Sequence, residues 1–470
     1  MGCAGGGAKD RIDAHIPISY PDIARVFALY EPLAMRSADY KFELVLAEEF
    51  SPNRTVDLWT VRLKPGIEFH NGKTLTADDA IFSIRRIINP KNPGAGAAGL
   101  SDIDPQGLRK LDERTFEIRL KSPFATFDTE LGGYANGIVP VGYDPKKPVG
   151  TGPFRFGSFT PGERSIFPAH KNYWRHGLPH VDELVIIDFP DDTARINALL
   201  GGQVHAIDNV PFAQGRVMGV TPGVKPLVAK TGAWLPFTMR VDQAPFDDVR
   251  VRQAMRLVVD RPQMVLQALA GEGSIANDLY SPFDPCYAAD LPQRHQDYAQ
   301  AKSLLKAAGR EGLEVELVTA DVAAGLVEAA QVFAEQARGA GIRVKIRKVD
   351  SGVFYGSDYL KWTFAQDFWF TRDYLAQVST CAMPGSPYNE THWSDPKFQA
   401  LIGEARRTLD HNKRCAILHD AQKMEYDTGG YIIWGFRNQI DAYSAKTTGW
   451  VPAKTGTPLG NYGFAPVHFV

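Results

Sequence analysis

The residues best suited to chemistry lie in one aromatic and acidic run, residues 364–375, with the sequence FAQDFWFTRDYL. Within it Arg372 precedes Asp373, so a cationic and an anionic side chain are adjacent. A guanidinium presents a planar fork of N–H donors that suits a carboxylate or a phosphate. The alternative is an ordinary surface ion pair between the two residues, which contributes only about 0–1 kcal/mol. The first interpretation predicts non-covalent recognition of a charged ligand.

Covalent chemistry is suggested by two short patterns near the end of the chain. Residues 394–397 (SDPK) match S-x-x-K and residues 454–456 match K-T-G, a pair that resembles penicillin-recognising serine acyl-enzymes. The S-D-N element of those enzymes is missing, and K-T-G also occurs at Lys230. Ser394 is equally well placed as the N-cap of a following helix. Because no nucleophile–base pair stands out, the sequence predicts a protein that is not an enzyme and uses no cofactor.

Two other patterns are better explained by loops. Residues 94–99 match G-x-G-x-x-G, but a dinucleotide fingerprint must follow a strand and open a helix, and this run follows a helix and two Asn-Pro pairs. His170, His176 and His180 lie in a segment interrupted by glycine and proline. A metal needs convergent ligands. We therefore expect solvated loop histidines and no metal site.

Bulk composition limits the class of protein. A chain of 470 residues with 44% hydrophobic and 23% charged residues is typical of a globular protein of two or three domains. The net charge of −2 gives no reason to expect a nucleic-acid partner. No run of about 20 apolar residues is present to span a membrane. Among Cys286, Cys381 and Cys415 at most one disulfide is possible, and none of them has C-x-x-C spacing.

The clearest structural pattern is the run from Trp59 to Ile87. Its first residues alternate between apolar and polar, as in a half-buried strand. Lys-Pro-Gly at 64–66 and Asn-Gly at 71–72 predict turns. Thr76 followed by Asp79 predicts a capping box at the start of an amphipathic helix.

This run also carries a family resemblance. W-T-V-x-L-K-P-G-I-x-F-H-N-G-x-x-L-T-A-D-D is similar to the signature of family 5 solute-binding proteins, the peptide- and nickel-type receptors of bacterial ABC importers. V-G-T-G-P-F at 149–154, N-Y-W at 172–174 and the segment 245–254 also match that family. The resemblance extends from about residue 30 to 460.

The resemblance implies an α/β fold, that of the two-lobed periplasmic binding proteins (type II, cluster C). It implies a tether at 1–9, lobe I at 10–236 with an extra subdomain at about 40–165, lobe II at 237–435, and a return to lobe I at 436–470. A solute held between the lobes would be buried by hinge closure.

The residues themselves predict a strand–helix–strand unit over 312–349, with strands at 312–319 and 342–349 and a helix at 325–338. Such a unit makes a parallel, right-handed crossover. Ligands gather beyond the carboxyl ends of such strands. The loop after Val349 and the one around Asp373 are therefore candidate ligand-binding loops.

The resemblance supplies roles for this second loop. In peptide-type members a strand ends in tryptophan, and an Asp-Tyr pair and an asparagine follow. Trp369, Asp373 and Asn389 fit that order. The resemblance implies that Asp373 binds the ligand's α-ammonium, with Asp367 as the alternative. The chain has D-Y-L-A-Q where the family has D-Y-P-D-P, which puts a peptide ligand in question.

Four aromatic residues are candidates for the walls of the ligand site, each with an ordinary core position as the alternative. They are Tyr20, Trp234, Phe354 and Trp369.

The resulting functional prediction is a monomeric receptor that delivers a small peptide or a peptide-like, amino-acid-derived solute to an ABC permease. The alternative ligands are a charged sugar conjugate or opine, an oligosaccharide, or a metal chelate. Among these, Arg372 and the altered Asp-Tyr loop suit the charged sugar conjugate or opine.

The chain begins MGCAGGGAKD. Gly2-Cys3 followed by small residues resembles the junction at which a lipoprotein signal peptide is cut, with Met1-Gly2 as the remnant of that signal or an artificial start. The sequence thus predicts lipidation at Cys3 and a receptor outside the cytoplasm, in the periplasm or at the cell surface.

Overall fold

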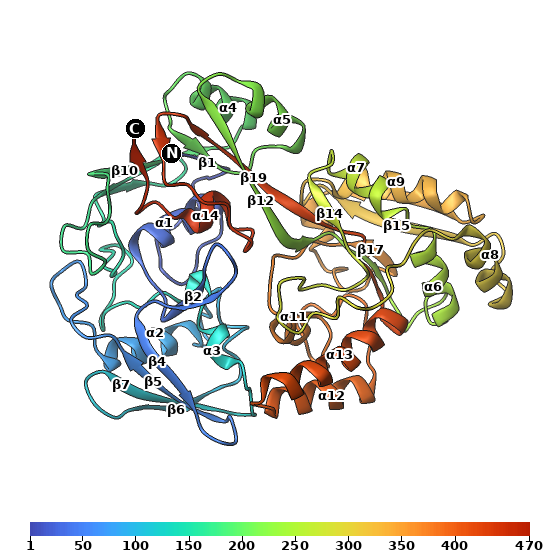
Figure 1. Cartoon of the computed structure of the whole chain (residues 1–470), viewed down its shortest axis with the longest axis horizontal. Helices are drawn as coiled ribbons and strands as arrows, with labels where there is room; N and C mark the ends of the chain where they lie inside the picture. The colour runs from blue at the N-terminus through green and yellow to red at the C-terminus, as the bar shows by residue number, and fades with distance from the viewer. The chain divides into compact units, whose positions relative to one another are not determined.

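The computed structural model describes residues 1–470, which divide into two compact units. Unit 1 contains Met1–Ala229 and Gln439–Val470, and unit 2 contains Lys230–Asn438. Both chain termini therefore belong to unit 1 (Figure 1). The polypeptide enters unit 2 within β12 (Val224–Trp234) and leaves it within β19 (Gly435–Ser444).

A mixed eight-stranded sheet has the order β12-β19-β11-β1-β10-β9-β8, and β14 also pairs with β19. Strand β1 is parallel to both of its neighbours, whereas the β10–β9 and β11–β19 pairs are antiparallel. The other strands are β1 (Gly2–Ala4), β8 (Ser158–Thr160), β9 (Arg164–Pro168), β10 (Glu183–Phe189), β11 (Ala206–Ile207) and β14 (Gly273–Ile275).

A second sheet of unit 1 is antiparallel, with the order β4-β5-β7-β6. It contains β4 (Ala47–Pro52), β5 (Leu58–Leu63), β6 (Ile103–Lys110) and β7 (Thr115–Leu120), and α2 (Ala77–Ile87) packs on it. Trp59, Val61 and Leu63 are buried, as their alternation predicts. The capping box of Thr76 and Asp79 is confirmed.

The sheet of unit 2 has the order β16-β15-β17-β13-β18. Its strands are β13 (Phe237–Met239), β15 (Glu314–Ala320), β16 (Arg343–Val349), β17 (Phe364–Gln366) and β18 (Tyr431–Ile432). Helix α9 (Leu326–Arg338) joins β15 to the parallel β16, so the predicted crossover is confirmed. Because β16 and β17 are both parallel to β15, Val349 at the end of β16 and Asp367 directly after β17 lie at the same edge of the sheet.

The remaining elements are shorter or peripheral. In unit 1 they are α1 (Tyr20–Leu29), β2 (Ala34–Arg36), β3 (Phe42–Leu44), α3 (Phe127–Glu130), the 3-10 turn η1 (Tyr134–Asn136), α4 (Asp192–Leu200), α5 (Phe212–Val220), β20 (Thr447–Thr448), α14 (Pro458–Tyr462) and β21 (His468–Phe469). In unit 2 they are α6 (Val249–Leu257), α7 (Arg261–Ala268), α8 (Tyr298–Ala307), α10 (Ser351–Phe354), α11 (Tyr374–Cys381), α12 (Pro396–Arg407) and α13 (His411–Thr428). No helix combines the length and the apolar character that a bilayer crossing requires.

The N-terminal residues differ from the predicted tether. Gly2–Ala4 forms β1, which lies between β10 and β11, and the Cys3 side chain is fully buried. A segment can be buried in this way because neighbouring strands satisfy its backbone groups. Burial also raises the pKa of the Cys3 thiol. The prediction of a lipid on Cys3 is therefore corrected, because its sulfur packs inside the unit.

Two other local predictions are also corrected. The N-cap of α12 is Asp395, whose carboxylate accepts from the N–H groups of Lys397 and Phe398, and not Ser394. His170 is buried and packs edge-to-face on His70 at 4.9 Å, whereas His176 is exposed as expected.

The aromatic segments 234–239 and 431–436 are each divided between two strands. The first divides at Leu235-Pro236, since proline has no N–H for a ladder, and the second divides at Ile433-Trp434.

Candidate functional site

The site begins at Asp367, the residue directly after β17. Its side chain is nearly buried, with 4% of the residue exposed. Its carboxylate accepts hydrogen bonds from the hydroxyls of Tyr355 and Tyr359, each at 2.9 Å, and from the N–H of Phe368 at 2.8 Å. Burial raises the pKa of Asp367, and these donors oppose that rise. All of the donors are neutral groups.

A second buried acid, Glu390, lies against Asp367. It accepts a hydrogen bond of 2.5 Å from the Tyr431 hydroxyl. Burial raises the pKa of Glu390 well above its usual value, and the negative charge of Asp367 raises it further. Two carboxyl groups this close do not both ionise readily. Burial and the nearby Asp367 carboxylate therefore both favour the protonated form of Glu390.

A stack of aromatic rings supports the two acids. Trp234 lies parallel to Tyr280 at 5.3 Å and to Trp369 at 5.9 Å, and the Tyr431 ring meets it edge-on at 5.3 Å. The main chains of Trp234 and Trp369 also exchange hydrogen bonds of 3.0 and 2.9 Å. Both tryptophans are buried, so the stack fixes the base of the loop that carries the acids.

Arg372 lies at the rim of this stack. Its guanidinium carbon is 5.6 Å from the centre of the Trp369 ring, and one N–H donates to the Thr380 hydroxyl at 3.1 Å. A cation over an indole face is attracted by the ring's quadrupole. The predicted residues Asp367, Trp369 and Arg372 thus form one continuous group.

The other predicted residues have different positions. Asp373 is the half-buried N-cap residue of α11, and the Asn389 amide donates to the Trp393 carbonyl at 3.2 Å, which closes a turn. Phe354 is buried and packs against the rings of Tyr355 and Tyr359, the two tyrosines that donate to Asp367. Tyr20 begins α1 in unit 1, whereas all the others belong to unit 2.

Sequence reasoning did not identify Glu390, Tyr355, Tyr359 and Tyr431. Of these residues, Tyr355 and Tyr359 do lie in the predicted loop after Val349. Tyr355 is the C-cap residue of the short helix α10, and Tyr359 lies in the turn that follows it. Glu390 directly follows the predicted Asn389, but no pattern distinguishes it from a surface glutamate.

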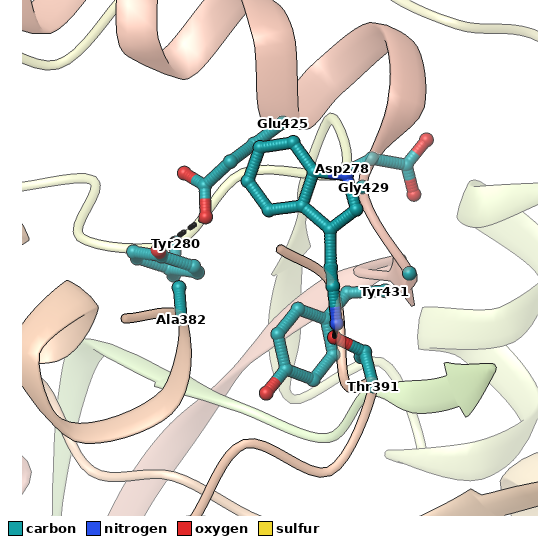
Figure 2. A pocket seen from close by; sticks show the side chains of 9 residues that line it. Asp278, Tyr280, Ala382, Thr391, Glu425, Gly429 and Tyr431 are labelled. Carbon is teal, nitrogen blue, oxygen red and sulfur yellow. Dashed lines mark hydrogen bonds between the residues drawn. The ribbon is translucent and has the colours of Figure 1, made fainter. Parts of the chain in front are cut away.

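A small cavity lies beside the site in unit 2, and Figure 2 shows side chains that line it. Glu425 points from α13 toward Tyr280, whose hydroxyl donates to it at 2.5 Å. Burial raises the pKa of Glu425 to about 7. The cavity volume is about 10 Å³, room for about one water molecule. It is too small for a peptide and is part of the support of the site.

Comparison with known proteins identifies the family. The family model of bacterial extracellular solute-binding proteins, family 5, matches residues 41–379. The dipeptide-binding protein of Escherichia coli K12 is 26% identical over 93% of this chain and 89% of its own length. The glutathione-binding protein GsiB of Pectobacterium atrosepticum is 24% identical over 94% of this chain and 88% of its own length.

A solved structure matches the fold. The periplasmic binding protein AgaA of Agrobacterium tumefaciens R10, solved with agropinic acid, has a TM-score of 0.82 and 22% identity over 100% of this chain and 98% of its own. The likeness confirms the predicted fold class, and the family match confirms the resemblance seen at residues 59–79. The chain therefore belongs to the family 5 bacterial extracellular solute-binding proteins, the substrate receptors of ABC importers.

Proposed function

We propose that this receptor binds a small peptide, or a peptide-like solute derived from amino acids, through the ligand's ammonium group at Asp367. The observation that carries the proposal is a buried acid pair, Asp367 and Glu390, whose contacts are neutral groups. A buried charge is costly unless it is paired. A ligand cation would provide that missing partner.

The geometry indicates which side the ammonium approaches from. Tyr355 covers Asp367 and is itself 41% exposed, whereas the Trp369 side is closed by packed rings. An ammonium has three N–H donors and can replace the hydrogen bond of one phenol. We propose that the ligand displaces the Tyr355 hydroxyl and keeps that of Tyr359.

The same arrangement supports Asp367 over Asp373 as the ammonium-binding residue. Asp373 occupies the N-cap position of α11, but its side chain makes no capping hydrogen bond, and the Tyr374 N–H donates to Asp284 at 2.8 Å instead. Asp367 is more deeply buried, and burial raises its pKa. Perturbed acids of this kind gather at functional sites.

The relatives support a peptide ligand, because two of them are named for dipeptide and glutathione binding. A second candidate is an anionic opine, since AgaA was solved with agropinic acid. Arg372 is the observation in its favour, because a guanidinium on the rim suits a ligand carboxylate. A free peptide also has a carboxylate that Arg372 would bind.

The remaining parts of the proposal concern setting and partners. The receptor would act outside the cytoplasm, in the periplasm or at the cell surface, as a monomer that serves the transmembrane subunits of an ABC permease. We propose no enzymatic activity, because the relatives are named as binding proteins. A lipid anchor at Cys3 is not included, since that thiol is buried in β1.

A thermal-shift screen tests the proposal. Dipeptides, tripeptides, their N-acetylated forms and agropinic acid would be compared. A ligand at about 100 times its Kd should stabilise the protein by about 2.7 kcal/mol. We expect free peptides to raise the melting temperature and N-acetylated peptides to have no effect. A shift with agropinic acid alone would reject the peptide class.

Ligand binding should also release a proton. The ammonium of a bound peptide lowers the pKa of Glu390, whose pKa in the free protein is raised by burial and by Asp367. Affinity should then rise with pH until Glu390 is ionised in the free receptor. Titration calorimetry in two buffers of different ionisation enthalpy measures this release. Glu390→Gln should abolish the buffer dependence, and proton uptake by the wild type would contradict the proposal.

A further inference from the structure

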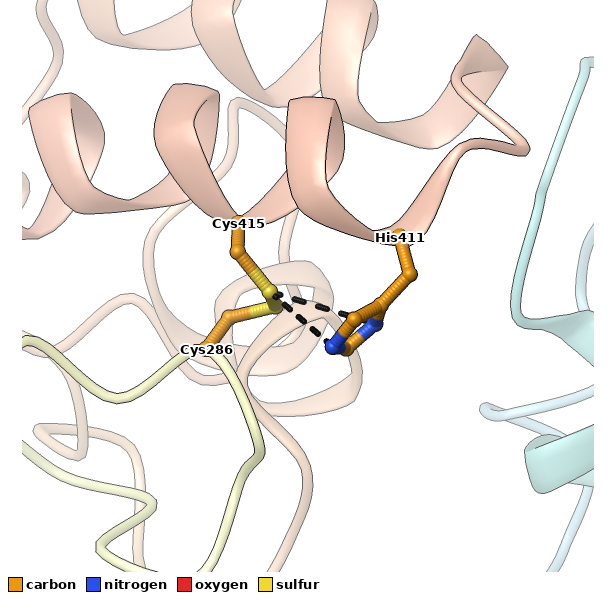
Figure 3. A group of neighbouring side chains, drawn as sticks. All are labelled: Cys286, His411 and Cys415. Atoms are coloured by element: carbon orange, nitrogen blue, oxygen red, sulfur yellow. Dashed lines mark hydrogen bonds between the residues drawn. A yellow bond between two sulfur atoms is a disulfide. The ribbon is translucent and has the colours of Figure 1, made fainter.

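The structure contains a disulfide between Cys286 and Cys415 with a histidine beside it. Figure 3 shows His411 and Cys415 on the same face of α13, with Cys286 facing them from a neighbouring loop. The Cys415 sulfur is 3.6 Å from Nε2 and 3.9 Å from Nδ1 of His411. One ligand-type atom from each of the three residues lies within 4.8 Å of the others.

We infer that these three residues form a redox-gated site for a thiophilic divalent metal of the zinc class. In the oxidised chain the sulfurs are bonded to each other and are poor ligands, because the thiolate is the form that binds a metal. Reduction by a dithiol makes two cysteine thiols available, and with His411 they form a two-sulfur, one-nitrogen set. Zinc favours such ligands, and its fourth position would be left to water.

The spacing of the ligands suits this role. His411 and Cys415 are four residues apart in a helix, so their side chains lie one above the other on one face. The Cα atoms of Cys286 and Cys415 are 4.7 Å apart. The imidazole of His411 is exposed, which gives a metal ion access from solvent.

Other contacts hold the two cysteines together when the disulfide is open. Gln422, about two turns beyond Cys415 on α13, is completely buried. Its amide donates to the Cys286 carbonyl at 2.8 Å and accepts from the Ala288 N–H at 2.9 Å. These bonds fix the loop of Cys286 to α13 independently of the sulfur bridge. Reduction should therefore leave the ligands preorganised.

The chemistry balances with one reductant and one metal ion. A dithiol reduces the bridge to two cysteine thiols and is itself oxidised to a cyclic disulfide. Binding of M²⁺ then converts both thiols to thiolates and releases two protons. The guanidinium of Arg414, 3.5 Å from the His411 ring, adds a positive charge that favours the thiolate forms.

Cobalt(II) is the probe that tests the site. The whole chain would be reduced with dithiothreitol, freed of reductant without oxygen, and titrated with Co²⁺ and then Zn²⁺. We expect about one Co²⁺ per chain, with sulfur-to-cobalt charge-transfer absorption that Zn²⁺ removes. The oxidised chain should show none. His411→Ala should weaken Co²⁺ binding about tenfold or more.

Controls separate this site from other thiols and from loss of fold. The double variant Cys286→Ser/Cys415→Ser keeps the buried Cys3 and Cys381 and should show no charge-transfer band. His419→Ala changes a half-buried histidine of the same helix that bonds to Asp290, outside the three-residue group, and should leave affinity unchanged. Absorption that persists in the double variant would overturn the inference, as would equal affinity in His411→Ala. Loss of the far-ultraviolet dichroism on reduction would overturn it too, since Gln422 is inferred to keep the fold.

Discussion

Replacing Asp367 by Asn should weaken the binding of a peptide with a free amino group by about thirtyfold or more. The substitution keeps the size of the side chain and one oxygen acceptor for the tyrosine hydroxyls, but it removes the negative charge. Truncating one member of a buried, hydrogen-bonded charge pair costs about 2–5 kcal/mol of binding free energy. Every 1.4 kcal/mol corresponds to about a tenfold change in Kd. Titration calorimetry of wild type and variant with one dipeptide measures the difference.

Asp373→Asn provides the matched control for this experiment. The Asp373 side chain makes no capping hydrogen bond, so replacing it by asparagine should leave the stability of α11 unchanged. We expect a change in Kd of less than about tenfold, since any charge effect at this half-buried position is partly screened. The opposite pattern, with a large loss in Asp373→Asn and none in Asp367→Asn, would assign the ammonium site to Asp373.

Local patterns predicted the elements of this fold well. The alternation at Trp59, Val61 and Leu63 and the capping box at Thr76 depend on residues close in sequence. In the unit β15-α9-β16, with its two parallel strands, apolar residues recur with the period of a strand or a helix in each element. The ring of Phe333 on the apolar face of α9 packs on that of Phe237 in β13, with centres 4.4 Å apart. Such signals can be read without knowing the tertiary structure, because each element's buried face is encoded within its own sequence.

The candidate site was only partly predictable because its key contacts join distant residues. Asp367 was recognised as an alternative, but its partner Glu390 is 23 residues away and Tyr431 follows 41 residues later. Cys3 is a second residue whose position depends on a contact with a distant part of the sequence. Small residues around it suggested a tether, whereas pairing with Asp188 of β10, 185 residues away, makes it part of a sheet. Long-range pairing of this kind leaves no local pattern in a single sequence.

The second large effect is expected at Arg25, whose side chain is completely buried in unit 1. Its guanidinium donates to both oxygens of Asp188 at 2.6 Å, and it also bonds to Asp22 at 2.9 Å and Asp10 at 3.3 Å. The network joins α1 to β10 and to the N-terminal segment. Burial raises the pKa of Asp188 to about 6 even though Arg25 opposes that rise. Without Arg25, several buried acids would lose their common cation.

Arg25→Met should destabilise unit 1 by about 3–5 kcal/mol near pH 8, because it leaves buried charges unpaired. That corresponds to a fall in melting temperature on the order of 10 °C. Acidification should reduce the loss. The pKa of Asp188 is raised in the folded state and rises further in the variant, so the folded chain binds more protons than the unfolded one, and stability falls as pH rises through that range.

Thermal melts of wild type and Arg25→Met at about pH 8 and about pH 5 measure both effects, since the second pH lies between the unfolded and folded pKa values of Asp188. Arg109→Met is the control, because Arg109 makes a similar ion pair with Glu117 but its side chain is 69% exposed. Its loss should stay within about 1 kcal/mol at either pH. A loss in Arg25→Met that is equally large at both pH values would mean that lost packing around the methylene stem, and not unpaired charge, causes the destabilisation.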